Sequence, residues 1–135
     1  MYLSCVLDRS WSHRQWVCTS FFGASGPWDA ELDFAAAMLR TDVRNNSAWN
    51  HRWFSLTRGG GLSFLDGCSA VEDTADARLD IVAREVDFTL SAILLVSRNE
   101  SSWSYLRGLL RGRLLSSFPR ILKVWAFTVY YPEKI

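Results

Sequence analysis

The spacing of apolar residues predicts amphipathic helices along most of the chain. Within residues 31–40 the apolar side chains recur at i, i+3, i+4 and i+7, which places them on one face of an α-helix. They are Leu32, Ala35, Ala36 and Leu39. Residues 79–96 repeat this period, with Leu79, Val82, Val86, Leu90 and Ile93. The alternation typical of strands is weak everywhere except residues 124–131, so the pattern predicts an all-α fold.

Each of these helices is followed by a polar turn and then by a second predicted helix. The turns are Arg44–Ser47 and Arg98–Ser102, and their Asn and Ser side chains can accept hydrogen bonds from the free N–H groups of the next helix. The second helices carry one apolar face each, formed by Trp49, Trp53 and Leu56 or by Trp103, Leu106 and Leu110. Helix pairs of roughly 35–40 residues are typical of an α-solenoid.

Internal repeats support this interpretation. Trp11-Ser-His-Arg14 returns as Trp49-Asn-His-Arg52. At an offset of 54 residues, seven positions of the second unit are identical in the third. They are Glu31, Asp33, Phe34, Arg44, Asn45, Ser47 and Trp49, which match Glu85, Asp87, Phe88, Arg98, Asn99, Ser101 and Trp103. The extra length between the second and third units falls in residues 58–78, a Gly-rich segment that is predicted to be an inserted loop.

The composition is unusual, since seven of the 135 residues are tryptophan. The repeats explain this excess. A Trp at a fixed place in each helix pair can fill the space between neighbouring pairs. The Arg three residues later can stack on the indole or bind carbonyl groups, and the Asn four residues earlier can close the turn. We interpret this constellation as structural. Its members are Trp11, Arg14, Asn45, Trp49, Arg52, Asn99 and Trp103.

Several kinds of chemistry are disfavoured by the sequence. The net charge of +1 provides no general attraction to nucleic acid or anionic lipid. The sequence contains neither a Gly-x-Ser-x-Gly elbow nor a P-loop, and no carboxylate or Cys lies at ligand spacing from His13 or His51. We therefore expect no catalytic residue and no metal site. Three cysteines without metal spacing, with neither a signal peptide nor a long apolar run, predict a cytoplasmic protein that is not inserted into a membrane.

Three stretches resemble a known family. They are HRQWV (His13–Val17), DVRNNSAWNHRWF (Asp42–Phe54) and EVDFTLSAILLVSRNESSWSYLRGLL (Glu85–Leu110). These segments look like the repeats of protein prenyltransferase α subunits, in particular of the α subunit shared by protein farnesyltransferase and type I geranylgeranyltransferase. The resemblance covers about residues 11–122. It therefore implies a chain of about three repeats (11–122), with a divergent end at 1–10 and a divergent tail at 123–135.

The resemblance implies a right-handed superhelix of helical hairpins that wraps around a separate β subunit. In the family, the heterodimer transfers a farnesyl or geranylgeranyl group from its diphosphate to the Cys of a C-terminal CaaX motif. The β subunit holds the zinc and most of the substrate site, and the magnesium is also expected to bind through it. This chain is therefore expected to bind no cofactor and to be inactive alone. Because turns and inner helices of such repeats face the β subunit, Asn46, Asn50 and His51 are candidate partner-facing residues, with capping and solvent exposure as the alternative.

The sequence also departs from the family. The family's diphosphate-contacting Lys lies in a repeat that precedes those present here, and Leu7, Asp8 and Arg9 stand where Asn-Tyr-His is expected. The third repeat has Leu106 in place of Arg, with Arg107 one position later. No catalytic residue therefore carries over, and we expect a fragment of a longer solenoid.

One alternative remains open. Residues 107–123 combine Arg and Lys with nearby aromatic side chains, a composition found in proteins that bind single-stranded nucleic acid. The rival hypothesis is a helical-repeat adaptor that binds a peptide or RNA and has no enzymatic role. The repeated residues favour the first interpretation, because they are Trp and turn Asn rather than variable base-contacting side chains.

Overall fold

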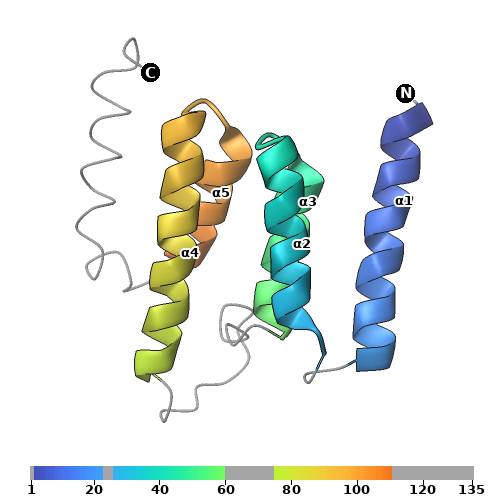
Figure 1. Cartoon of the computed structure of the whole chain (residues 1–135), viewed down its shortest axis with the longest axis horizontal. Helices are drawn as coiled ribbons and strands as arrows, with labels where there is room; N and C mark the ends of the chain where they lie inside the picture. Colours follow the sequence, from blue (N-terminus) through green and yellow to red (C-terminus); the bar gives the residue numbers. More distant parts are fainter. Residues whose placement is uncertain (1, 23–25, 60–74, 111–135) are drawn as a thin grey trace. The chain divides into compact units, whose positions relative to one another are not determined.

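A computed structural model describes residues 2–22, 26–59 and 75–110, which are helical apart from short turns (Figure 1). The elements are α1 (Tyr2–Val17), the π-helical turn η1 (Cys18–Phe22), α2 (Trp28–Thr41), α3 (Asn46–Arg58), α4 (Ala75–Leu95) and α5 (Glu100–Leu109). The all-α prediction is confirmed for this part of the chain. None of the described helices is both long and apolar enough to cross a membrane. The chain divides into two compact units, residues 1–70 with α1 to α3 and residues 71–135 with α4 and α5.

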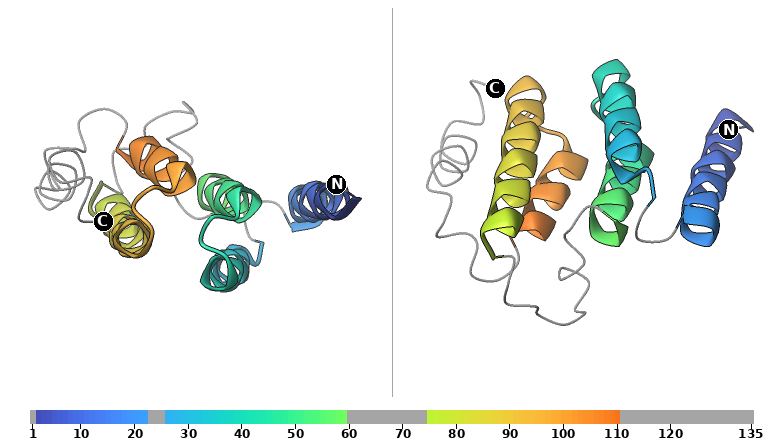
Figure 2. Two further views of the ribbon diagram at one scale, coloured as in Figure 1. Left: turned by 90° about the horizontal axis from the view of Figure 1, so that it is seen from above. Right: turned by 60° about the horizontal axis from the view of Figure 1, so that its bottom comes forward.

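In the first unit, α2 and α3 form a helical hairpin (Figure 2). Each helix buries one stripe, made of Trp28, Leu32, Ala35 and Leu39 on α2 and of Ala48, Trp49 and Leu56 on α3. Near the open end of the hairpin, the Trp28 ring meets Phe54 edge-on at 5.9 Å. The same indole covers Gly59, where an added Cβ would overlap it. Gly59 is therefore required for close approach rather than for an unusual backbone angle.

In the second unit, α4 and α5 pack together in the same way. The buried residues are Val82, Val86, Leu90 and Ile93 on α4 and Tyr105, Leu106 and Leu109 on α5. The predicted core of this hairpin is confirmed at Val82, Val86, Leu90, Ile93 and Leu106. Leu79 is exposed near the start of α4, and Trp103 and Leu110 are only half-buried.

Both hairpin turns are closed by the same two types of side chain, an Asn and a Trp at equivalent positions. The Oδ1 atom of Asn45 accepts a hydrogen bond from Ala48 N, and Asn99 Oδ1 accepts one from Ser101 N, both at 3.2 Å. Six residues before each repeat Trp, a carbonyl accepts the indole N–H: Trp49 Nε1 donates to Val43 O at 2.8 Å, and Trp103 Nε1 donates to Ser97 O at 2.7 Å. The predicted role of Asn in the turn is confirmed, whereas the indole hydrogen bond has no counterpart in the sequence analysis.

Some predicted boundaries shift and others fall outside the described residues. The helix expected at 31–40 covers residues 28–41, and the divergent end (1–10) lies within α1 apart from Met1. α4 begins at Ala75, so the last four residues of the predicted loop at 58–78 are helical instead. Residues 60–74, the tail at 123–135 and the basic segment beyond Leu110 lie outside the described part of the chain.

Candidate functional site

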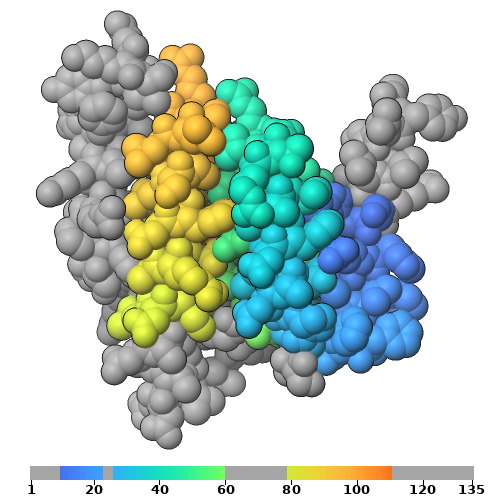
Figure 3. All heavy atoms as spheres, in the orientation of Figure 1, coloured from blue at the N-terminus to red at the C-terminus, as the bar shows by residue number. Residues whose placement is uncertain are grey.

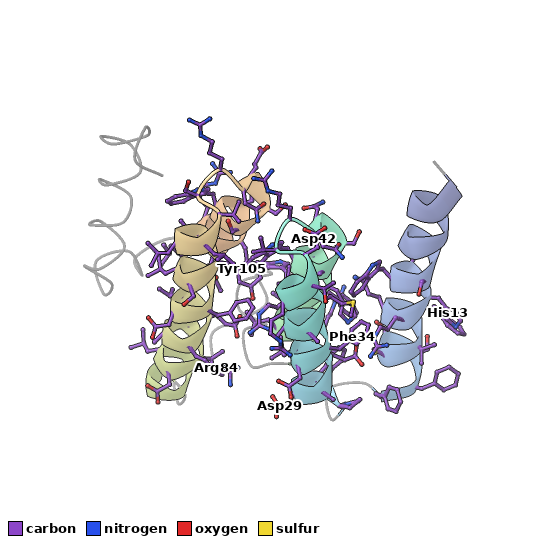
Figure 4. All side chains as sticks on the ribbon, turned by 45° about the horizontal axis from the view of Figure 1, so that its top comes forward. His13, Asp29, Phe34, Asp42, Arg84 and Tyr105 are labelled. Carbon is purple, nitrogen blue, oxygen red and sulfur yellow. The ribbon has the colours of Figure 1, made fainter. Side chains whose placement is uncertain are left out.

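The junction between α1 and the α2–α3 hairpin is built around one buried carboxylate. Glu31, in the first turn of α2, receives both arms of the Arg14 guanidinium from α1. Arg14 Nε donates to Oε2 at 2.7 Å and Arg14 Nη2 donates to Oε1 at 2.9 Å. The guanidinium carbon also lies 3.8 Å from the centre of the Phe34 ring, on the side of α2 that points toward α1 (Figure 4). A bidentate, stacked Arg joins the two helices in one geometry, and their side chains meet in the space-filling view (Figure 3).

His51 reaches the same carboxylate from α3. Its Nε2 lies 2.7 Å from Glu31 Oε2, its side chain is 0% exposed, and its Nδ1 is buried without a hydrogen-bond partner. A second ring proton would therefore have no acceptor, so the neutral tautomer with hydrogen on Nε2 fits this position. Burial lowers the pKa of His51 and outweighs the opposing effect of Glu31, so the net pKa lies below its ordinary value.

Glu31 stays ionised in this environment. Burial raises the pKa of its carboxyl group, but the hydrogen bonds from Arg14 and His51 and the charge of Arg14 outweigh burial, and the net pKa lies below its ordinary value. A carboxylate that is already ionised and fully engaged does not serve as a proton donor near neutral pH. The triad formed by Arg14, Glu31 and His51 is therefore a structural junction between repeats.

The third repeat contains part of the same arrangement. Tyr105 OH donates to Glu85 Oε2 at 2.7 Å across twenty residues, the separation that also joins His51 to Glu31. Within each hairpin the second helix thus presents a donor to a glutamate on the first. The position after this donor differs between the repeats. Arg52 Nη1 donates to Leu32 O at 2.9 Å, whereas Leu106 is buried as an apolar side chain.

A cavity of about 510 Å³ lies beside the triad, between α1 and α2. Trp11, Cys18, Phe34 and Met38 are among its lining residues. Burial raises the pKa of the Cys18 thiol, and the nearby Glu31 charge adds to this effect, so the thiol remains protonated and poorly nucleophilic. Among the described residues no group of three or more His, Cys, Asp or Glu side chains could hold a metal ion. The contacts of Arg14, Glu31 and His51 can fix the geometry of the repeats.

The structure places the predicted motif residues at the turns and at the junction. Trp11 packs against Phe34 and His51, with ring centres 5.6 and 5.0 Å apart, so this Trp does lie between repeats. Trp49 is buried at 2% exposure, and its partner is a turn carbonyl of its own repeat.

The three candidate partner-facing residues differ in their exposure. Asn46 and Asn50 are exposed on α3, and their contact with a partner stays a prediction. His51 is enclosed by Glu31, Trp11 and Phe34, which corrects the expectation that it faces a partner. Sequence reasoning did not assign Glu31 a role, although its identity with Glu85 was the signal that could have found it.

Comparison with known proteins decides the family. The sequence model of the family described as "Protein prenyltransferase alpha subunit repeat" matches residues 28–59 and 82–113. These two segments contain the α2–α3 hairpin and most of the α4–α5 hairpin. The chain belongs to the protein prenyltransferase alpha subunit repeat family. The prenyltransferase repeats defined by sequence thus coincide with the two hairpins whose turns are closed by Asn and Trp.

Curated relatives of this prenyltransferase-repeat chain carry one name, "Protein farnesyltransferase/geranylgeranyltransferase type-1 subunit alpha". The protein from Pisum sativum is 41% identical over 86 residues, which are 64% of this chain and 22% of the relative. That from Dictyostelium discoideum is 35% identical over 98 residues, covering 72% and 26%. That from Arabidopsis thaliana is 40% identical over 86 residues, covering 64% and 22%. The chain therefore matches about a quarter of the length of these relatives.

Proposed function

We propose that this chain acts as a noncatalytic, scaffolding part of the α subunit of a heterodimeric protein prenyltransferase. The enzyme would transfer a farnesyl or geranylgeranyl group from its diphosphate to the Cys of a C-terminal CaaX motif. The observation that carries the proposal is the coincidence of family repeats with closed helical hairpins, together with relatives that are named as such α subunits.

The described contacts support a scaffolding role. Glu31 binds side chains from two other helices, and each hairpin turn is closed by an Asn cap and an indole hydrogen bond. Such contacts hold the exposed side of a turn in a fixed geometry, as a surface recognised by a partner requires. We further propose that the hairpins continue a right-handed superhelix that wraps around a β subunit.

The chemistry of transfer is assigned to the partner. We propose that the zinc and magnesium of the enzyme are bound through the β subunit, as the resemblance to the family implies. The proposed location of the complex is the cytoplasm, where CaaX proteins are synthesised.

Co-expression with a β subunit from the same source tests the partner. The tagged chain should retain the β subunit on an affinity column. Asn50→Arg should weaken retention, since Asn50 is exposed beside the turn between α2 and α3. Ala30→Arg places the same side chain at an exposed position of α2 and serves as the matched control.

A chimaera tests the complete assembly. The segment of the Pisum sativum α subunit that matches this chain is replaced by the corresponding 86 residues of this chain. The chimaera is then paired with the Pisum sativum β subunit. A stable heterodimer that prenylates a CaaX peptide supports the proposal, whereas failure of both chain and chimaera to form a heterodimer contradicts it. Turnover of the peptide by the chain without any β subunit contradicts the assigned noncatalytic role.

A further inference from the structure

Two side chains of α1, Trp11 and Arg14, contact the α2–α3 hairpin around His51. The centre of the Trp11 ring lies 5.0 Å from that of His51, and Arg14 binds the Glu31 carboxylate that His51 also contacts. The hairpin has an apolar core of its own and a closed turn. A change at His51 therefore acts on both contacts of α1, whereas the hairpin keeps most of its own contacts.

The surroundings of His51 suit a neutral ring and oppose a charged one. Its side chain is 0% exposed, and its Nδ1 atom has no hydrogen-bond partner in the described part of the chain. The charged groups that face the ring are Arg14 from α1 and Glu31 from α2. The ring is also enclosed by the aromatic side chains of Trp11, Phe34 and Phe54. A proton on Nδ1 would lack an acceptor and would place a second cation beside Arg14.

Movement of α1 relieves both of these costs. Of the three rings that enclose His51, Trp11 is the one that lies outside the hairpin, so its displacement lets water reach the imidazole without unfolding the hairpin. Trp11 also lines the cavity of about 510 Å³ between α1 and α2, which leaves room for this movement.

The same proton also weakens the ion pair of Arg14. Glu31 Oε2 lies 2.7 Å from Arg14 Nε and 2.7 Å from His51 Nε2, so a charged imidazole competes with the guanidinium for one oxygen. Repulsion between the two cations acts in the same direction. Protonation of His51 thus weakens the contacts of Trp11 and of Arg14 together.

The third repeat shows that the contact between donor and glutamate does not itself require a His. Tyr105 occupies the position of His51 and donates to Glu85 Oε2 at 2.7 Å. An imidazole is the side chain whose charge ordinarily changes between pH 5 and pH 8, and a phenol stays neutral over this range. A hairpin can therefore be joined by either residue, but only His makes the contact sensitive to protons.

We propose that His51 is a proton-operated switch at the junction between α1 and the α2–α3 hairpin. When the ring is neutral, α1 is docked; when the ring takes up a proton, Trp11 and Arg14 separate from the hairpin, which stays folded. This is a local opening that changes the angle between successive repeats. All the groups involved lie within residues 11–54, and the inference does not rest on the proposed subunit role.

The direction of the switch follows from linkage. Burial lowers the pKa of His51 in the docked form, whereas the opened ring has its ordinary value of 6.5. The open form therefore takes up the proton first as the pH falls. The equilibrium constant for opening should rise by up to about tenfold between pH 7.5 and pH 5.5.

The thiol of Cys18 provides a measure of opening, because its side chain is 3% exposed and lines the cavity between α1 and α2. Labelling of Cys18 by N-ethylmaleimide is followed by mass spectrometry in the full chain, with Cys5 and Cys68 replaced by Ser. The rate in urea divided by the rate in the native chain at the same pH gives the protection of Cys18. Protection should fall by up to about tenfold between pH 7.5 and pH 5.5, and a change below about twofold overturns the proposal.

Matched variants connect this pH dependence to His51. His51→Gln keeps an N–H donor but does not titrate, and His51→Tyr introduces the donor of the third repeat, so protection should no longer vary with pH in either variant. His13→Gln changes an exposed imidazole on α1 and should keep the pH dependence of the unmodified chain. The proposal is wrong if the pH dependence persists in a folded His51 variant.

NMR of the unmodified chain provides a test that needs no variant. The midpoint of the His51 ring titration should coincide with the midpoint of Cys18 deprotection. The indole N–H signal of Trp49, which donates to Val43 O in the hairpin turn, should keep its position over the same range. A ring that titrates while Cys18 stays protected overturns the proposal, as does loss of the Trp49 signal in step with Cys18 protection, because the whole unit would then unfold.

Discussion

Glu31 on α2 accepts a 2.7 Å hydrogen bond from His51 on α3, and this pair joins the two helices of the first hairpin. The same carboxylate binds the Arg14 guanidinium through both oxygens.

Replacing Glu31 with Gln should destabilise the fold. The substitution keeps the shape of the side chain but leaves Arg14 without a counter-charge. It also replaces one of the two acceptor oxygens by an NH2 group, so Arg14 or His51 loses an acceptor. Because Arg14 is partly exposed, we expect a loss of about 1–3 kcal/mol in the free energy of unfolding, measured in urea. Asp33→Asn, an exposed change on the same helix, should stay within about 0.5 kcal/mol. Similar losses for the two variants would show that the junction contributes little.

The stability of the chain should decrease on acidification in two steps. The folded pKa of His51 lies below its ordinary value of 6.5, so the unfolded chain takes up a proton first as the pH falls, and stability is lost below about 6.5. Glu31 also has a lowered folded pKa, so its contribution is present above its ordinary value of 4.5 and is lost as the pH falls further.

The variant His51→Gln tests the first step, the loss of stability below about pH 6.5. Gln keeps an N–H donor for Glu31 but does not titrate, so the free energy of unfolding should vary less between pH 7 and pH 5 than in the unmodified chain. His13→Gln changes an exposed imidazole and serves as the control. An unaltered pH profile in His51→Gln would contradict the buried, neutral imidazole.

Trp49→Ala should reduce the free energy of unfolding by about 3–5 kcal/mol, because a large buried side chain is removed. Trp49→Phe retains much of the packing but loses the hydrogen bond to Val43 O. Its free energy of unfolding should fall by about 1 kcal/mol more than the smaller buried area of Phe explains. Trp16→Ala should stay near 0.5 kcal/mol in the chain alone, since that ring is exposed. A small effect at Trp49 would place its indole outside the core.

Gly59→Ala should destabilise the first unit although Gly59 has an ordinary negative φ of −139°. Replacement of such a Gly usually stabilises by about 0.4–1 kcal/mol through the unfolded chain. Here the added Cβ overlaps the Trp28 indole, and overpacking of this kind typically costs about 1–3 kcal/mol. The double variant Gly59→Ala with Trp28→Leu should recover part of the loss relative to Trp28→Leu alone. A gain in Tm for Gly59→Ala would contradict the close packing.

Helix periodicity and the repeats were sufficient to predict the hairpins, their turns and the Asn caps. These features are local: an apolar stripe at helical spacing and an Asn at the start of a helix have few alternative explanations. The starts of α2 and α4 were less well predicted, because the helices expected from residues 31 and 79 begin at Trp28 and Ala75 instead.

The Glu31 junction could not be predicted in the same way, because it depends on contacts between residues 17 and 20 positions apart in sequence. The sequence shows that Glu31 and Glu85 match, but not that one meets an imidazole and the other a phenol. Nor does it show that His51 is enclosed while the equivalent His13 is exposed, since that difference depends on which neighbouring helices cover each residue.

The indole hydrogen bonds have a consequence for how such a chain can change in length. In both hairpins the Trp indole donates to a carbonyl six residues earlier, so this hydrogen bond requires a turn of fixed length. A residue inserted between Val43 and Trp49 would move the donor and the acceptor out of reach. The hydrogen bond from the Trp49 indole and the Asn45 cap of α3 would both be lost. Insertions should therefore accumulate between hairpins and not within them. The additional residues that separate the second and third repeats follow this rule, because they fall after α3 and before α4.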